Sequence, residues 1–275
     1  MRSRFWPSLI FFLIVTVAAY IMMYIELKNP ALTTEKGGVV LTHVPRESYR
    51  EKNELLISAS LFPFSRNFNP TQVYLYYRES KEGEFKQLPM TRLGDSDRYL
   101  QLLPGQLKGK KSYYFVEARA ADNIRLRLPE DAPEGKQLFF VRWQGETSRW
   151  LLYSHIFLMV AAFLTWMHAF FWALEHVMTG QPRPYIYHLA LSATVIFFIT
   201  GFPLGFLVAK QAFGTAWTGV PFGLDITDNK TLITFLYWAI VLIPFRKNSR
   251  PRVFSYLVLL GTALTLVVFM VPHSI

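Results

Sequence analysis

Four of the chain's six histidines lie within or at the ends of long apolar segments, where imidazole groups are uncommon. They are His155, His168, His176 and His188. An ionisable side chain at membrane depth is costly, so it usually faces the interior of a helical bundle and marks a functional position. Neutral imidazole is an axial ligand of non-covalently bound haem b, and its hydrogen bonding also suits a quinone. The histidines therefore predict haem b or quinone binding within a membrane domain.

Helix geometry indicates which of these histidines can act together, because the two ligands of a haem lie at similar depth. His176 lies near the end of one apolar segment and His188 near the start of the next. His168 is eight residues before His176, which is about 12 Å along a helix. We expect His188 to pair with His168 or His176, and four aromatic residues between positions 166 and 172 favour His168. His155 is 13 residues before His168, a net rotation of about 220°, so these two do not share a helix face.

The sequence around His188 carries a family resemblance. It reads Tyr187-His188-Leu189-Ala190-Leu191-Ser192, and Ile199-Thr200-Gly201-Phe202-Pro203-Leu204 follows. This stretch resembles the opening helix of the membrane cytochrome b subunits of hydrogenases and formate dehydrogenases, in which a histidine precedes small residues, an apolar stretch and Thr-Gly. In that family the histidine is an axial haem ligand, so the resemblance points to His188. The chain departs from the pattern at Leu189, where the family has Trp, and it lacks the family's further histidine pairs.

A second group of candidate ligands lies in the polar loop between Lys210 and Lys230. Asp225 and Asp228 offer carboxylate oxygens to a hard cation, although their spacing lacks the length and the terminal Glu of an EF-hand. A docking or quinone-edge role is a further possibility for this loop.

Both groups of candidates have a structural alternative. The histidines suit an interfacial role, in which they bond to backbone carbonyls or water within a belt of Trp and Tyr. In the loop, Thr227 or Asp228 suits a helix cap, because a side-chain oxygen there accepts backbone N–H groups and an acid favours the helix dipole.

Residue types and motifs exclude several other functions. The chain has no Cys, which rules out disulfides, thiolate nucleophiles, iron–sulfur clusters, thiolate zinc sites and covalent haem attachment. The sequence contains no phosphate-binding glycine loop, no nucleophile elbow and no HExxH motif. The net charge of +10 is spread along the chain, which does not favour a nucleic-acid partner. We expect a protein without independent catalytic activity.

Five apolar segments form the elements that would position the histidines. With 17% charged residues against about 25% in an average soluble chain, the composition is typical of a membrane protein. The first segment, Phe5 to Ile25, is long enough to span a bilayer and predicts an uncleaved signal anchor at 1–25, although Val17-Ala18-Ala19 leaves cleavage open. The others predict a four-helix transmembrane domain at 150–275, with helices at about 150–174, 185–209, 231–245 and 253–271. The segment at 231–245 is short and spans fully only by recruiting Asn229 and Lys230.

Residues 26–149 predict an all-β domain, because apolar and polar residues alternate in short runs between turn residues. The predicted strands cover 54–60, 72–78, 98–103, 111–120, 124–128 and 137–143. The Leu103-Pro104-Gly105 turn, the run Tyr113 to Ala120 and the Asp122-Asn123 turn resemble the last hairpin of a fibronectin type III or immunoglobulin-like sandwich. The resemblance implies a scaffold for docking and no chemistry of its own.

The distribution of Lys and Arg predicts the orientation in the membrane. The segment Phe245 to Arg252 carries four basic residues and no acid, so it and the N-terminus should lie in the cytoplasm. We therefore predict a bacterial inner-membrane protein of mixed α and β structure, with a periplasmic sandwich and C-terminus. The predicted function is a non-catalytic subunit of an electron-transfer or respiratory complex, which contacts lipid and protein partners and binds haem b or quinone. The alternative is a structural or assembly protein whose sandwich binds a partner without any cofactor.

Overall fold

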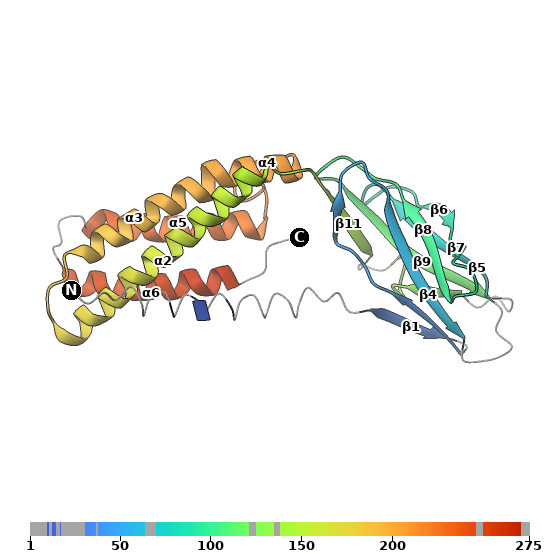
Figure 1. Cartoon of the computed structure of the whole chain (residues 1–275), viewed down its shortest axis with the longest axis horizontal. Helices are drawn as coiled ribbons and strands as arrows, with labels where there is room; N and C mark the ends of the chain where they lie inside the picture. The colour runs from blue at the N-terminus through green and yellow to red at the C-terminus, as the bar shows by residue number, and fades with distance from the viewer. Residues whose placement is uncertain are drawn as a thin grey trace. The chain divides into compact units, whose positions relative to one another are not determined.

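The structure, a computed structural model of the chain, describes residues 31–36, 38–63, 70–120, 125–134, 138–245 and 250–270, with positions 10, 13, 14 and 17. Most of the predicted signal anchor lies outside the described residues, as do 246–249 of the predicted cytoplasmic loop and 271–275. The chain divides into two compact units. One, from residues 28–146 with 212–214, holds the strands, and the other holds the membrane helices (Figure 1).

The strand unit is a sandwich-like domain of two sheets. The strands of the first sheet are β1 (Leu32–Lys36), β2 (Val39–His43), β4 (Leu55–Pro63), β7 (Thr91–Arg92) and β8 (Arg98–Leu103). The strands of the second sheet are β3 (Ser48–Arg50), β5 (Pro70–Arg78), β6 (Lys86–Pro89), β9 (Lys111–Ala120), β10 (Arg125–Leu128) and β11 (Phe139–Gln144). The first sheet has the order β1-β2-β4-β8-β7 and the second β3-β11-β9-β5-β6, with β10 also paired to β9. This domain confirms the predicted β-sandwich architecture.

Alternating side chains separate the core of the sandwich from its outer faces. On β9, Tyr114, Val116 and Ala118 are buried in the core between the sheets. The residues between them, including Glu117, therefore point to the opposite side of the second sheet. Trp143 of β11 is fully buried in the same core.

His43 is a buried polar residue of this core with both ring nitrogens bonded. Its Nδ1 lies 2.8 Å from the Ser58 carbonyl oxygen, and its Nε2 lies 2.8 Å from the Tyr114 hydroxyl. Because a carbonyl only accepts, Nδ1 donates, and Nε2 of the neutral ring accepts from the tyrosine. Burial lowers the pKa of His43, and the hydrogen bond to Ser58 opposes this effect only in part.

The six predicted strands correspond to β4, β5, β8, β9, β10 and β11. The hairpin that resembles a fibronectin or immunoglobulin-like sandwich is formed by β9 and β10. It is not the last hairpin of the domain, because β11 follows and also pairs with β9. The sequence pattern does not indicate the other strands, each of which has five residues or fewer and so offers little alternation.

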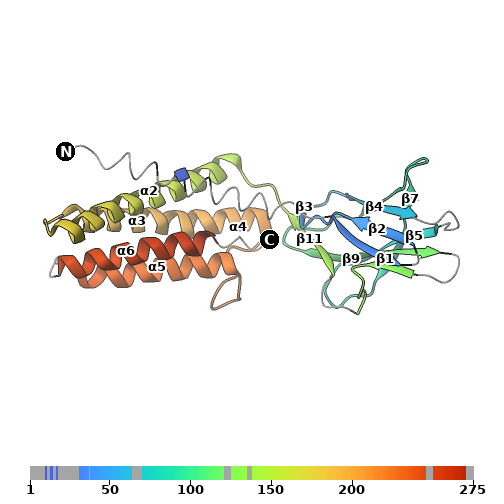
Figure 2. The same cartoon turned by 90° about the horizontal axis from the view of Figure 1, so that it is seen from below.

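Among the described residues, the helical unit contains four helices that are long and apolar enough to cross a membrane. They are α2 (Arg149–Thr179), the continuous helix 185–213, α5 (Ile226–Phe245) and α6 (Pro251–Met270). The second consists of α3 (Tyr185–Ile199), a π-helical turn at Thr200–Leu204 and α4 (Gly205–Phe213). Figure 2 shows these helices running alongside one another. The helix α5 begins at Ile226, so it includes Asn229 and Lys230 and reaches 20 residues.

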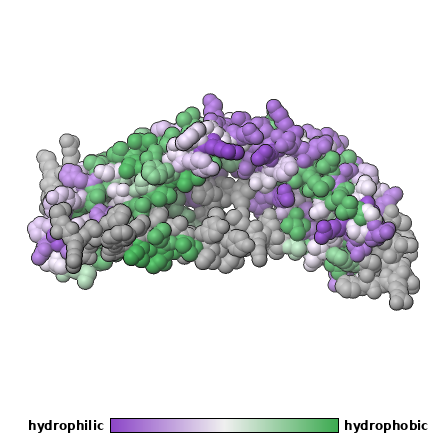
Figure 3. Space-filling view, viewed as in Figure 1, coloured by the Kyte–Doolittle hydropathy of each residue, from purple (hydrophilic) through white to green (hydrophobic). Residues whose placement is uncertain are grey.

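Aromatic and small residues pack the helices together. The Trp166 and Trp238 rings stack with centroids 5.0 Å apart, and Phe197 packs beside Trp166. Large apolar side chains such as Phe157 and Ile243 are instead exposed on the helices. Apolar residues also gather over the helical unit in the face drawn in Figure 3, whereas polar residues prevail over the sheet unit. This distribution indicates that the helices contact membrane lipid.

Candidate functional site

The two histidines favoured as a haem pair lie in different surroundings. His168 is half-buried on α2, where its Nε2 accepts a hydrogen bond from Trp172 Nε1 at 3.1 Å. His188 is exposed on α3, and the centroid of its ring lies 5.7 Å from that of the Tyr187 ring. An axial ligand uses a ring nitrogen lone pair, and that of His168 Nε2 is already engaged by the indole. Haem b or quinone binding through these residues stays a prediction.

The other two histidines bond to backbone carbonyl groups. His155 Nδ1 lies 3.1 Å from the Thr200 carbonyl oxygen, and Thr200 Oγ1 donates to the His155 carbonyl at 3.0 Å. This pair of bonds connects α2 to the π-helical turn. His176 is buried near the end of α2, and its Nδ1 lies 2.5 Å from the Gln181 carbonyl oxygen.

The carboxylates of the 210–230 loop accept hydrogen bonds from backbone N–H groups. Asp225 precedes α5, and its Oδ1 accepts from Thr227 N at 2.8 Å and Asp228 N at 3.2 Å. Asp228 Oδ2 accepts from Thr218 N at 2.6 Å and Gly219 N at 3.1 Å. The contacts of Asp225 are those of a helix cap. The predicted cap at Thr227 or Asp228 is wrong in its residue, because the helix begins at Ile226 and Asp228 accepts from the loop instead. In the described part of the chain, no group of three or more His, Asp and Glu side chains is arranged to hold a metal.

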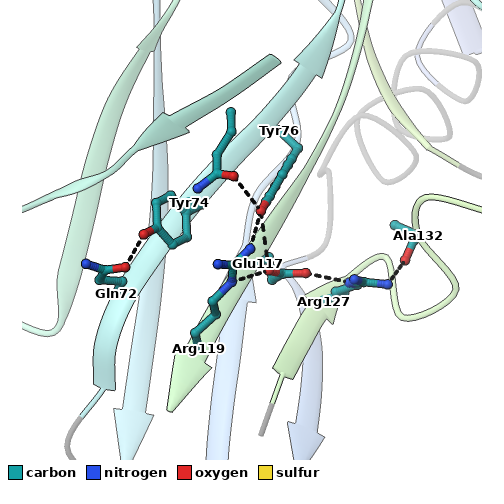
Figure 4. A network of polar contacts seen from close by, with 8 residues as sticks. Gln72, Tyr74, Tyr76, Glu117, Arg119, Arg127 and Ala132 are labelled. Atoms are coloured by element: carbon teal, nitrogen blue, oxygen red, sulfur yellow. Dashed lines mark hydrogen bonds and ion pairs between the residues drawn. The ribbon is translucent and has the colours of Figure 1, made fainter. Parts of the chain in front are cut away.

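The second sheet carries a charged cluster centred on Glu117 of β9 (Figure 4). Glu117 is only 1% exposed. Its Oε1 accepts from Arg119 Nε and its Oε2 from Arg127 Nε, both at 2.7 Å. Arg119 Nη2 also donates to the Tyr76 hydroxyl at 2.5 Å, and Arg127 Nη1 donates to the Ala132 carbonyl at 2.9 Å. One buried carboxylate therefore orients two guanidinium groups on the sheet.

The electrostatics of the cluster keep Glu117 ionised. Burial by itself raises the pKa of the carboxyl, but the hydrogen bonds from Arg119 and Arg127 outweigh burial, and the pKa of Glu117 lies below its usual value. Burial, and then the negative charge of Glu117, raises the pKa of the Tyr76 hydroxyl. At neutral pH the carboxylate is thus negative, while both guanidinium groups are positive.

Glu117 belongs to a larger surface, which we call the basic–aromatic face. The face consists of the outward side chains of β5, β9, β10 and β11. Its cations are Arg78, Lys111, Arg119, Arg125, Arg127 and Arg142, and its aromatic residues are Tyr74, Tyr76, Tyr113, Phe115 and Phe140. Glu117 is the one acidic residue within these four strands. The face therefore has a strong positive excess.

Several of these cations lie over aromatic rings of the same face. The Tyr76 and Phe115 rings stack at 4.7 Å, nearly parallel at 1°. Arg119 Cζ lies 4.8 Å from the centre of the Tyr74 ring, and Lys111 Nζ lies 4.1 Å from that of Phe140. Such contacts attract the cation to the face of the ring and restrict its side-chain rotamers. The face presents positive charge in an ordered arrangement.

The amino-acid sequence carries only part of the signal for this face. Glu117 and Arg119 are two residues apart in a predicted strand, so alternation alone places them on one side. Tyr74 and Arg127 both lie opposite Glu117, because β5 and β10 each pair with β9. Those pairings set the positions of Tyr76 and Arg127 beside the carboxylate, and no local pattern indicates them.

Similarity to known proteins is found among solved structures and not among family models or curated sequences. No family model matches the chain, and no curated protein sequence matches it. Among solved structures, the chain is similar to that of astrotactin-2, described as a conserved vertebrate-specific and perforin-like membrane protein involved in neuronal development. The TM-score is 0.26 at 8% sequence identity, and the alignment covers 84% of this chain and 39% of that chain. The chain thus spans well under half of the other protein, and a similarity at this level carries no argument about function.

Proposed function

We propose that the protein is a non-catalytic membrane subunit whose β-sandwich docks an acidic segment of a partner protein on the basic–aromatic face. The observation that carries this proposal is the charge of that face. Its strands contribute six cations and a single acid, Glu117, whose two oxygens already accept from Arg119 and Arg127. Six cations against one acid leave these strands with a net charge of +5, which favours an anionic partner.

The residue types on the face favour a protein partner over a simple counterion. Arginine and aromatic side chains are enriched in the centres of protein interfaces, where they supply most of the binding energy. The ring contacts of Arg119 and Lys111 hold their charges in place before binding. A preorganised side chain loses less conformational entropy when a complex forms. An acidic polypeptide segment offers both carboxylates for the cations and apolar groups for the rings.

The helical unit would anchor this docking domain in a membrane. Its four apolar helices contact lipid, and the distribution of Lys and Arg supports an orientation in which the sandwich lies outside the cytoplasm. In this proposal the partner is another component of the same membrane complex. The role of the bundle is to hold the domain at the membrane surface.

A charge reversal tests the proposal directly. Arg125 is exposed on β10 opposite Arg119, and it lies outside the hydrogen bonds to Glu117. The full-length protein in lipid nanodiscs is titrated with a fluorescent peptide of alternating Glu and Tyr, and binding is followed by anisotropy. We expect Arg125→Glu to weaken binding by about fivefold, since an exposed ion pair contributes up to about 1 kcal/mol.

The matched control is Arg98→Glu, which makes the same charge change on β8 of the first sheet. Arg98 is exposed, so this variant alters net charge without touching the basic–aromatic face. Equal weakening by both variants would mean that only net charge attracts the peptide, and it would contradict the proposal. A nanodisc-bound protein that binds anionic vesicles but not the peptide would also contradict it.

A further inference from the structure

A small cavity lies where α2 ends and α3 and α6 begin. Its volume is about 170 Å³, and it is lined by side chains of the 176–187 segment together with Pro251 and Phe254. Pockets for drug-sized ligands have about 300–1,000 Å³, so this one suits a small chemical group. All of these residues belong to the helical unit.

His176 brings an unsatisfied nitrogen to this cavity. Its side chain is 3% exposed, and its Nδ1 donates to the Gln181 carbonyl oxygen, which only accepts. The other ring nitrogen, Nε2, is buried and has no hydrogen-bond partner among the described residues. A buried polar atom without a partner is costly, so a ligand at Nε2 stabilises the site. When the ring is protonated Nε2 donates, and when it is neutral Nε2 accepts from a hydroxyl group.

Arg183 supplies a second group of the same kind. It also lines the cavity, and within the part of the chain that the structure describes its buried Nε has no hydrogen-bond partner. Its Nη2 donates to Glu175 Oε1 at 2.8 Å, and its guanidinium lies 5.1 Å from the Trp172 ring centre. These contacts fix the side chain, so the buried N–H is a preorganised donor.

Two helix N-termini meet the cavity as well. Residues Ile186 and Tyr187 lie in the first turn of α3, and Pro251 and Phe254 in that of α6. Neither first turn contains an acid, and the residue before α3 makes no side-chain cap. The N-terminal end of a helix carries a partial positive charge, which favours phosphate and other anions. The contribution here is this charge, because the N–H groups of Ile186 and Phe254 already donate to the Arg183 and Arg250 carbonyl groups.

An apolar groove adjoins this cavity. It indicates which chemical group is attached to an anion bound in the cavity. The groove has a volume of about 500 Å³ and runs between α3 and α5, where Leu191, Phe198 and Phe235 line it. Tyr187 lines both the groove and the cavity. An acyl chain suits the groove, while the cavity suits a phosphate.

From this arrangement we propose that the cavity at His176 and Arg183 binds the phosphate monoester of an anionic lipid, with an acyl chain in the groove between α3 and α5. The two unsatisfied nitrogens contact phosphate oxygens, and a hydroxyl of the monoester can donate to His176 Nε2 in its neutral form. Free inorganic phosphate shares this chemistry but lacks the acyl chain. The site belongs to the helical unit and the basic–aromatic face to the strand unit, so either proposal can fail without the other.

The test uses full-length protein in detergent micelles, titrated with short-chain phosphatidic acid and monitored by native mass spectrometry. His176→Asn keeps an N–H donor for the Gln181 carbonyl and removes Nε2. Arg183→Lys keeps the charge opposite Glu175 and removes the buried Nε–H. We expect each variant to weaken lipid binding at least about tenfold, the effect of losing one charged hydrogen bond. The matched control His188→Asn changes an exposed histidine at the same end of the bundle and should leave the affinity within about twofold.

Further probes identify the source of the phosphate and the outcomes that overturn the proposal. Phosphatidylcholine of the same chain length has a phosphate diester. If it binds as tightly as phosphatidic acid, the assignment of a phosphate monoester is overturned. Inorganic phosphate could bind as tightly as the lipid and lose affinity equally in both variants. This result would support an anion site at the cavity and overturn the assignment of a lipid as its ligand. If His176→Asn and Arg183→Lys both bind phosphatidic acid like the unaltered protein, the cavity is not the site and the proposal is wrong.

Discussion

At the scale of single residues, Glu117 organises the basic–aromatic face. Its carboxylate lies beneath two guanidinium groups, which would otherwise repel one another. In Glu117→Gln the amide accepts from at most one of them and brings its own N–H groups toward the other. Removing one partner of a buried charged group is strongly destabilising, but Arg119 and Arg127 are 35% and 31% exposed and partly screened by water.

We therefore expect Glu117→Gln to lower the free energy of unfolding of the sandwich by about 1–3 kcal/mol. Hydrogen exchange of the β9 amides, measured by mass spectrometry on the full chain, reports this locally as exchange that is roughly 5 to 150 times faster. Glu84→Gln is the control, because Glu84 is exposed in the loop before β6. If both variants exchange alike, Glu117 does not stabilise the face.

His43 makes the sandwich sensitive to acid. Burial lowers the pKa of His43 in the folded protein, whereas the unfolded chain titrates near its usual value of about 6.5. The unfolded state therefore binds more protons below that pH. The stability contributed by the neutral ring is fully present above about pH 6.5 and is lost as the pH falls, with a slope of up to about 1.4 kcal/mol per pH unit.

The measurement is the free energy of unfolding of the sandwich between pH 7.5 and pH 5.5, from exchange rates corrected for the intrinsic effect of pH. His43→Gln cannot titrate, so its stability should change less over this range than that of the unaltered protein. Identical pH dependence in the two proteins would rule out His43 as the source.

At the scale of elements, the contact between α5 and α6 depends on a missing side chain. Gly261 of α6 lies against Tyr237, and a Cβ added at Gly261 would collide with the Tyr237 ring and lie 3.1 Å from Trp238 Cζ2. Tyr237 is also held by its hydroxyl, which donates to the Leu257 carbonyl at 2.7 Å. The ring therefore cannot move away without losing this bond.

We expect Gly261→Ala to lower the stability of the helical unit by about 1–3 kcal/mol, the usual effect of overpacking a close contact. Thermal unfolding in detergent, followed by the loss of monodisperse protein, measures the change. Ala263→Val adds volume at an exposed position of the same helix and should have little effect. Equal midpoints for both variants would show that α5 and α6 do not pack closely at Gly261.

The elements also show what sequence can and cannot predict here. Long apolar runs and strict alternation indicate the membrane helices and the longer strands, because these signals are local. The start of α5 is not visible in hydropathy, since it depends on Asp225 accepting two backbone N–H groups before a polar first turn. The basic–aromatic face is also hidden, because pairing of β5 and β10 with β9 brings distant residues to Glu117.

At the scale of the whole molecule, the two functional hypotheses assign the functional site to different units. Electron transfer places it in the helices, at His168 and His188. A reduced-minus-oxidised visible spectrum of the purified protein tests that prediction separately, since a b-type band would support it and a colourless protein would contradict it. Docking places the functional site on the sandwich, where the structure describes an ordered cationic surface, and leaves the helices to hold it at the membrane.

The most direct test of docking is a hydrogen-exchange footprint of the Glu–Tyr peptide on the full-length protein in nanodiscs. The account predicts slower exchange in β5, β9 and β10 when the peptide is bound, with no change in β4 and β8. It also predicts that Arg125→Glu removes this protection and that Arg98→Glu retains it. Protection confined to the first sheet, or spread evenly over both sheets, would contradict a docking site on the basic–aromatic face.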